Sequence, residues 1–140
     1  MSAPGTLHRS YAAVPTSIAV AREALTGFAA GAGASPGERE RIRLAASEAL
    51  TNVVEHAYTA ADGEIEVVAA VTGDDLSVLV ADRGRGLRGG ERSHGLGLGL
   101  ALMHVSCDAL TLAQRSGGGL EVQMRFALAA SRGRVEVPHV

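Results

Sequence analysis

The sequence predicts an α+β fold, a two-layer sandwich of a mostly antiparallel mixed sheet with the helices on one face. Two long segments with helical spacing come early in the chain, and two pairs of short β-rich segments follow, each pair joined by a glycine-containing turn. This order is typical of a sheet that is covered by helices on one side. The 140 residues, 46% of them hydrophobic, suffice for one domain, which we expect to span residues 1–130.

The first two elements are predicted to be a strand and a helix. Residues 6–15 alternate weakly in polarity and end at a proline, which indicates a strand at a sheet edge. A helix is expected to follow, with Thr16 or Ser17 as its N-cap. Glycines at 31 and 33 end this helix near residue 30.

The second helix has a stronger start signal. Ser35, Pro36 and Glu38 form the pattern of a capping box, with proline at the first helical position. Apolar residues at helical spacing then extend the helix to about Tyr58. They are Ile42, Ala45, Ala46, Ala49, Leu50, Val53 and Ala57.

The second half of the chain is predicted to form two hairpins, separated by a polar loop and a short helix. In chain order these are strands at 63–71 and 76–82, the loop 83–94, the helix 95–107, and strands at 109–116 and 120–128. The turn TGDD joins the first pair of strands, and GGG joins the second pair. Residues 131–140 show no clear element, and we expect a mobile tail there.

Composition excludes several classes of protein. The chain has no lysine, so it lacks the lysine that a phosphate-binding P-loop and a eukaryotic-type protein kinase each require. A net charge of −2 gives no reason to expect a nucleic-acid or membrane partner. The single cysteine cannot form an internal disulfide, and we see neither a signal peptide nor a membrane span. We therefore expect a cytoplasmic protein.

Polar residues repeat along one side of the second predicted helix, in the stretch SEALTNVVEHAY at 47–58. Glu48, Asn52 and His56 are each four residues apart, so they stand in one row. The row could be the solvated face of an amphipathic helix. It could equally be a carboxylate base one turn from an amide oxygen that holds Mg²⁺, a cation that takes few protein ligands. The row alone leaves both interpretations open.

A second candidate motif closes an apolar strand, in VLVADRGRGL. Asp82 ends the strand, and Gly84 and Gly86 follow at alternate positions. Aspartate and glycine favour turns, so a simple hairpin turn would explain the pattern. Alternatively, the carboxylate accepts a hydrogen bond from a ligand, and the glycines let a flat ring lie against the backbone.

The third motif places Gly95, Gly97 and Gly99 at the start of the predicted short helix. Glycines there leave the first-turn amides open to an anion, which the helix dipole favours. Four arginines in the preceding loop could neutralise phosphates. A flexible surface loop is the alternative. The G-x-G-x-G spacing does not match a dinucleotide-binding fingerprint.

Together, the three motifs resemble those of the GHKL-type ATP-binding domains, and among them the bacterial anti-sigma factor serine kinases. The resemblance covers about residues 10–128. SEALTNVVEHAY is similar to the N-box of that family, DRGRG to its first glycine box, and HGLGLGLALM to its second.

The resemblance implies a role for each matching residue. Glu48 matches the general base that deprotonates the substrate serine, Asn52 the amide that coordinates Mg²⁺, and Asp82 the carboxylate that accepts the adenine amino group. The remaining matches are glycines around the nucleotide: Gly84, Gly86, Gly95, Gly97 and Gly99.

The function implied is that of an ATP-binding anti-sigma factor that phosphorylates a serine on an antagonist protein. ATP and Mg²⁺ would be its cofactors, and a sigma factor and the antagonist its partners, with a homodimer left open. One position departs from the family, because Leu120 stands after Gly119 where a threonine is usual. That departure favours the alternative function, a non-catalytic ATP-dependent switch that sequesters a partner protein.

Overall fold

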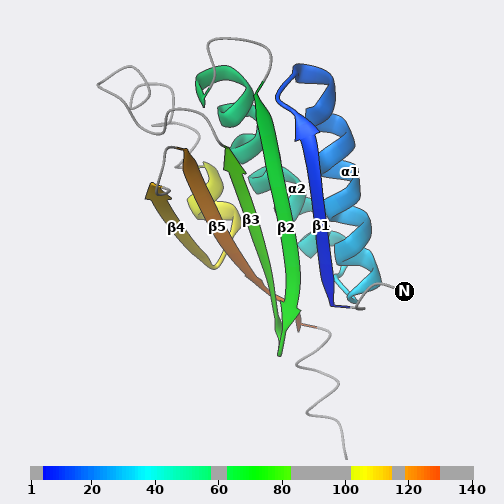
Figure 1. The fold of residues 1–140 in the computed structure, drawn as a ribbon. Coiled ribbons are helices and arrows are strands. Elements are labelled where there is room, and N and C mark those ends of the chain that lie inside the picture. The colour runs from blue at the N-terminus through cyan, green and yellow to red at the C-terminus, as the bar shows by residue number, and fades with distance from the viewer. Residues whose placement is uncertain (1–4, 58–62, 83–101, 115–118, 130–140) are drawn as a thin grey trace, which may run out of the picture.

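The computed structural model describes residues 5–57, 63–82, 102–114 and 119–129, and it forms a two-layer α+β sandwich (Figure 1). One layer is a five-stranded sheet in the order β1-β2-β3-β5-β4. The strands are β1 (Thr6–Ala12), β2 (Glu64–Thr72), β3 (Asp75–Asp82), β4 (Ala109–Gln114) and β5 (Leu120–Ala127). The expected fold class is confirmed, although all four strand pairings described are antiparallel, so the sheet is not mixed.

The helices form the other layer and cover one face of the sheet, behind it in Figure 1. They are α1 (Pro15–Gly31) and α2 (Pro36–Asn52), and residues 102–106 add a short helical segment. Helix α1 packs on α2 and contacts β1 and β2, whereas α2 contacts β3 and β5. None of the helices in the described ranges is long and apolar enough to cross a lipid bilayer.

Helix α2 begins where the sequence predicts. The Ser35 hydroxyl accepts a hydrogen bond from the Glu38 N–H at 3.1 Å, and the Glu38 carboxylate accepts one from the Ser35 N–H at 2.9 Å. This reciprocal capping box satisfies two of the amides that a helix start leaves without a partner.

The start of α1 corrects a prediction. Its N-cap is Val14, which makes no side-chain cap bond, and Pro15 occupies the first helical turn. Thr16 and Ser17 therefore lie inside the helix. Proline is well suited to this position because its φ is already helical and its missing N–H is not needed there.

Helix α2 ends earlier than the expected Tyr58. Regular α-helix stops at Asn52, and a π-helical turn, η1 (Val53–Ala57), continues it. Such wider turns are rare and frequently found at functional sites. Tyr58 lies outside the described residues, as do the expected tail at 131–140 and most of the loop and helix expected between 83 and 107.

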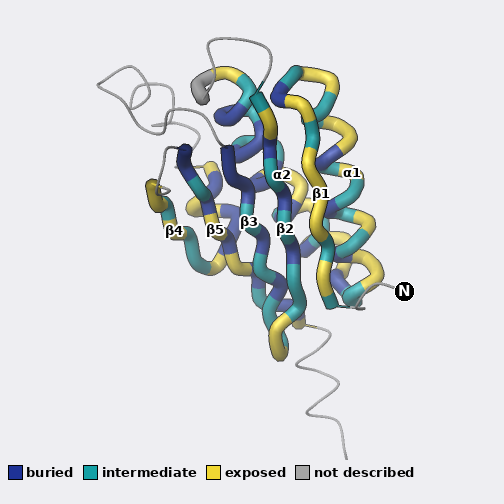
Figure 2. The backbone as a smooth tube through the Cα atoms, viewed as in Figure 1, coloured by how far each residue is buried: buried dark blue, intermediate teal, exposed yellow. Residues whose placement is uncertain are grey.

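The core lies between the two layers (Figure 2) and contains few aromatic side chains. Helix α2 contributes Ala45, Ala46 and Ala49, whose small side chains let the helix lie close to the sheet. Larger side chains fill the remaining space. They include Leu25, Ile42, Leu50, Ile65, Leu76, Met103, Met124 and Phe126, each at most 2% exposed.

Both predicted hairpins are present. Strands β2 and β3 join through the two-residue turn Gly73–Asp74, where Gly73 adopts a φ of +61° that favours glycine. Strands β4 and β5 form the second hairpin, and β5 also pairs with β3. These pairings place the C-terminal end of β3 next to the start of β5, at the same end of the molecule as the end of α2 (Figure 1).

Candidate functional site

Two of the predicted site residues lie at this end of the molecule, on different layers. Asn52 is the last residue of α2, and Asp82 is the last residue of β3, which contacts the η1 turn. Both are buried, with exposed fractions of 7% and 0%. Because buried polar groups are costly unless they have partners, their presence here needs a local reason.

The Asn52 side chain has an incompletely satisfied amide. Its Nδ2 atom is buried and has no hydrogen-bond partner among the described residues. A buried amide N–H without a hydrogen bond lowers the stability of the fold by about 1–3 kcal/mol. That loss is recovered if a ligand accepts the hydrogen bond. The position is therefore suited to a polar ligand at the end of α2.

The Asp82 carboxylate is positioned by the sheet. It closes β3, where its backbone pairs with Ile65 of β2, and its Oδ1 accepts a hydrogen bond from the Leu120 N–H at 3.3 Å. Strand pairing thus fixes where the carboxylate lies. A fully buried acceptor at the end of a strand can recognise a donor such as an exocyclic amine.

The backbone at Gly119 and Leu120 contributes to the site in a way that the sequence interpretation did not anticipate. Gly119 has a φ of +108°, a conformation that side chains rarely adopt, and it directs the following N–H to Asp82. The sequence pointed to Leu120 only as a missing hydroxyl. The available signal was the glycine, because a glycine between a turn and a strand often marks a special backbone conformation.

Glu48 lies one helical turn before Asn52 on α2. It is half-buried, at the border between the core side and the outer side of the helix. Four residues differ by about 40° in direction and about 6 Å along the axis, so the two side chains leave the same side of the helix. A carboxylate so placed can accept a proton from a group held near Asn52.

The structure therefore brings Asn52 and Asp82 to one end of the molecule, with Glu48 one turn away on α2. The five predicted site glycines cannot be placed in the same way. Gly84, Gly86, Gly95, Gly97 and Gly99 all lie outside the described residues.

Comparison with known proteins identifies the family. Residues 11–126 match the model of the histidine kinase-like ATPase domain. The chain is 34% identical to the serine-protein kinase RsbW of Bacillus licheniformis over 121 residues, which cover 75% of this chain and 76% of that protein. The serine-protein kinase RsbW of Bacillus subtilis is 32% identical over the same shares.

A solved structure agrees with these sequence matches. The crystal structure of the RsbU and RsbW domains of a Mycobacterium tuberculosis protein superposes with a TM-score of 0.71 at 28% identity. It covers 88% of this chain, which spans only 32% of that longer protein. The matches confirm the resemblance on which the sequence interpretation rests: the chain belongs to the family of histidine kinase-like ATPase domains.

Proposed function

We propose that this chain is an ATP-dependent serine protein kinase and anti-sigma factor, which phosphorylates an antagonist protein and sequesters a sigma factor. One observation supports the proposal most strongly. At a single end of the molecule, a buried amide with an unused nitrogen lies one helical turn from a half-buried carboxylate, beside a strand that ends in a fully buried carboxylate. Relatives named serine-protein kinases support the same activity.

The residues present fit Mg²⁺ and ATP. Asn52 would supply its amide oxygen to Mg²⁺, and its buried Nδ2, which has no partner among the described residues, could donate to a phosphate oxygen. Mg²⁺ typically takes one or two protein ligands together with phosphate oxygens and water, so a lone amide is an adequate contribution. Asp82 would accept the adenine amino group. Gly84 and Gly86 would let the flat ring lie against the backbone, and the glycines at 95, 97 and 99 would surround the phosphates.

The chemistry assigned to the chain is a proton transfer and the positioning of two reactants. The serine hydroxyl loses its proton to Glu48 as its oxygen bonds to the γ-phosphorus, and the bond from that phosphorus to the β–γ bridging oxygen breaks. The products are phosphoserine and ADP. Mg²⁺ held by Asn52 would neutralise charge on the phosphate oxygens. Because such reactions depend mainly on positioning and charge, one base on a rigid helix is sufficient.

The proposed domain organisation and location of the protein follow the sequence analysis. A single ATP-binding domain spans residues 1–130, and residues 131–140 form a tail. The protein acts in the cytoplasm, where a sigma factor and its antagonist are available.

The direct test is phosphate transfer. The purified chain is incubated with labelled ATP, Mg²⁺ and a panel of antagonist proteins, and each antagonist is also supplied with alanine in place of its target serine. We expect label on one serine of one antagonist and none on its alanine form. Calorimetry with ADP, with and without Mg²⁺, should show binding that requires the metal. An absence of binding by folded protein would contradict the proposed site.

A second function is favoured by Leu120. This residue is buried at 4% exposure and offers only its backbone N–H to Asp82. A site that lacks the threonine hydroxyl usual in the family at this position could bind ATP and capture a partner protein without transferring phosphate to it. If the chain binds ATP and a sigma factor but transfers phosphate to no antagonist, this switch replaces the kinase.

A further inference from the structure

The helix layer carries large apolar side chains that the fold leaves in solvent. Four are found among the described residues: Leu44 on α2, Leu102 and Val105 on the helical segment 102–106, and Val20 on α1. Their exposed fractions are 51%, 43%, 77% and 57% in that order. Single exposed apolar residues are normal on a protein surface, so only their grouping can be informative.

Three of the four lie on neighbouring elements. The Arg41 guanidinium on α2 donates to the Ser106 carbonyl oxygen at 3.5 Å and lies 4.0 Å from the Asp108 carboxylate. These contacts place the segment 102–106 beside α2, on the side from which Arg41 leaves the helix. Leu44 is three residues after Arg41 and so lies next to it on the helix surface. We call Leu44, Leu102 and Val105 the apolar patch.

The apolar patch is adjacent to the proposed base. Leu44 precedes Glu48 by one turn, about 6 Å along the axis. A stable protein complex buries roughly 800 Å² of each partner, which corresponds to a disc on the order of 16 Å in radius. A protein whose contact area is centred on Glu48, to which it brings a serine, would therefore cover Leu44 as well.

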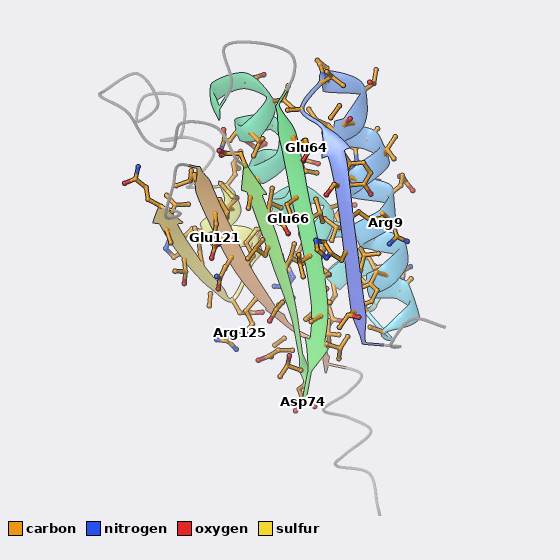
Figure 3. All side chains as sticks on the ribbon, viewed as in Figure 1. Arg9, Glu64, Glu66, Asp74, Glu121 and Arg125 are labelled. Carbon is orange, nitrogen blue, oxygen red and sulfur yellow. The ribbon has the colours of Figure 1, made fainter. Side chains whose placement is uncertain are left out.

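The open face of the sheet is less suitable for a protein that brings a serine to Glu48. Figure 3 shows the face of the sheet away from the helices, where the labelled Glu66, Glu121 and Arg125 lie. Charged groups there form ion pairs within the chain, with 2.9 Å separating Arg125 from Asp75. More importantly, that face lies on the side of the sheet opposite α2, so a partner bound there cannot reach Glu48.

We propose that the apolar patch is the docking surface for the antagonist protein, and that it contributes affinity for the folded antagonist beyond the contacts made by its serine. This inference rests on the proposed kinase function. Arg41 reaches from α2 to Ser106 and so lies among these apolar side chains, and Glu48 follows one turn after Leu44. The patch therefore combines apolar and charged groups, as protein interfaces do. The partner surface that fits it is apolar, lies beside the target serine, and is itself rimmed by charges of both signs.

The test compares a folded substrate with a peptide. Leu44→Asp and Val105→Asp place a charge in the patch, and Val20→Asp, an equally exposed apolar residue on α1, is the matched control. Each variant is assayed for transfer to the antagonist that the kinase assay identifies, and to a short peptide that contains only its serine segment. We expect KM for the folded antagonist to rise on the order of tenfold or more in both patch variants, because a charge placed at a buried anchor of an interface removes a large share of its affinity.

Transfer to the peptide, ADP affinity and melting temperature should stay at the values of the unaltered chain. The control should leave KM for the folded antagonist unchanged. An unchanged KM in both patch variants would overturn the docking proposal and leave the kinase intact, as would an equal rise in Val20→Asp. If the unaltered chain transfers phosphate to no substrate, the kinase proposal fails and the docking proposal fails with it.

Discussion

The two ends of α2 contain polar side chains that are equally buried and very differently satisfied. Glu38, at 8% exposure, uses both carboxylate oxygens: Oε1 accepts from the Ser35 N–H at 2.9 Å and Oε2 from the Ala129 N–H at 2.7 Å. Asn52, at 7% exposure, has an Nδ2 with no partner among the described residues. We call these the capped end and the site end of the helix.

The comparison shows two roles that a buried polar side chain can have. At the capped end, the carboxylate connects the start of α2 to Ala129, which lies just after the last strand, β5, so it stabilises the fold. At the site end, the described residues leave the Asn52 Nδ2 without a partner, as expected where a ligand completes the site. Changes at the site end are therefore expected to act on nucleotide chemistry, and changes at the capped end on stability.

The largest effect is expected from Glu48→Gln at the site end. Loss of a general base commonly reduces the rate by roughly two to four orders of magnitude, whereas shape and packing are kept. The measurement is phosphate transfer to the antagonist, with ADP affinity expected to be unchanged. Glu40→Gln, two turns earlier on α2 at an exposed carboxylate near Arg43, is the control. Transfer by Glu48→Gln at the full rate would remove Glu48 from the mechanism.

Asp82→Asn should weaken nucleotide binding. The amide can still accept the Leu120 N–H, but its NH₂ group would face the adenine amino group that the carboxylate is proposed to accept. An unsatisfied buried donor costs about 1–3 kcal/mol, or roughly fivefold to 150-fold in affinity. Calorimetry with ADP measures this effect. Equal affinity in a variant that melts like the unaltered chain would show that adenine does not bind at Asp82.

Glu38→Gln alters the capped end and should act on stability alone. A neutral amide can accept one of the two N–H groups and directs its own NH₂ at the other. We expect a loss of about 1–2 kcal/mol in the free energy of unfolding, measured by urea denaturation at pH 7. Nucleotide affinity should not change, and a weakened affinity would indicate that the two ends of α2 are coupled.

The same carboxylate predicts a pH dependence. Burial alone would raise the pKa of Glu38, but hydrogen bonds from Ala129 and Ser35 outweigh burial and hold the pKa below its ordinary value of 4.5. The folded state therefore binds the proton less readily than the unfolded state. The contribution of Glu38 to stability is complete above the unfolded pKa and is lost as the pH falls through the lower folded pKa. Urea titrations at several acidic pH values should show a smaller loss of stability in Glu38→Gln.

The smallest effects are expected at two glycines with positive φ. Gly73→Ala, in the turn at the capped end, meets no neighbouring atom and should cost about 1 kcal/mol from backbone strain alone. Gly119→Ala should cost at least as much, because its φ of +108° is less accessible to alanine. It should also lower ADP affinity by moving the Leu120 N–H away from Asp82. Equal ADP affinities in the two variants would show that this N–H does not position the carboxylate.

The sequence predicted those features of the fold that interactions between neighbouring residues determine. Ser35 and Glu38 interact within one helical turn, and Gly73 and Asp74 form a turn without help from the rest of the chain, so the start of α2 and the first hairpin could be located from the residues alone. Alternating apolar residues likewise located β2 and β5. The site residues Asn52 and Asp82 were selected by motif and are buried at one end of the fold, but their proposed roles await the experiments above.

The features that the sequence did not predict depend on tertiary packing. The apolar N-cap Val14 carries no signal, since nothing in its side chain distinguishes it from a strand residue. The change from α-helix to π-helix after Asn52 leaves the apolar pattern nearly the same, so periodicity could not detect it. The hydrogen bond from the Leu120 N–H to Asp82 joins a backbone group to a side chain in a different hairpin, and no local pattern reports such a pair.

The strand order has a consequence for how the chain folds. Strand β1 pairs with β2, from which both helices separate it in the sequence, whereas β2–β3 and β4–β5 are each joined by a short connection. Closing a long loop costs entropy before the paired strands can compensate for it, and topologies rich in such pairings fold slowly. The two hairpins and the capped helix α2 can therefore form early, and the docking of β1 on the sheet edge is expected to come late.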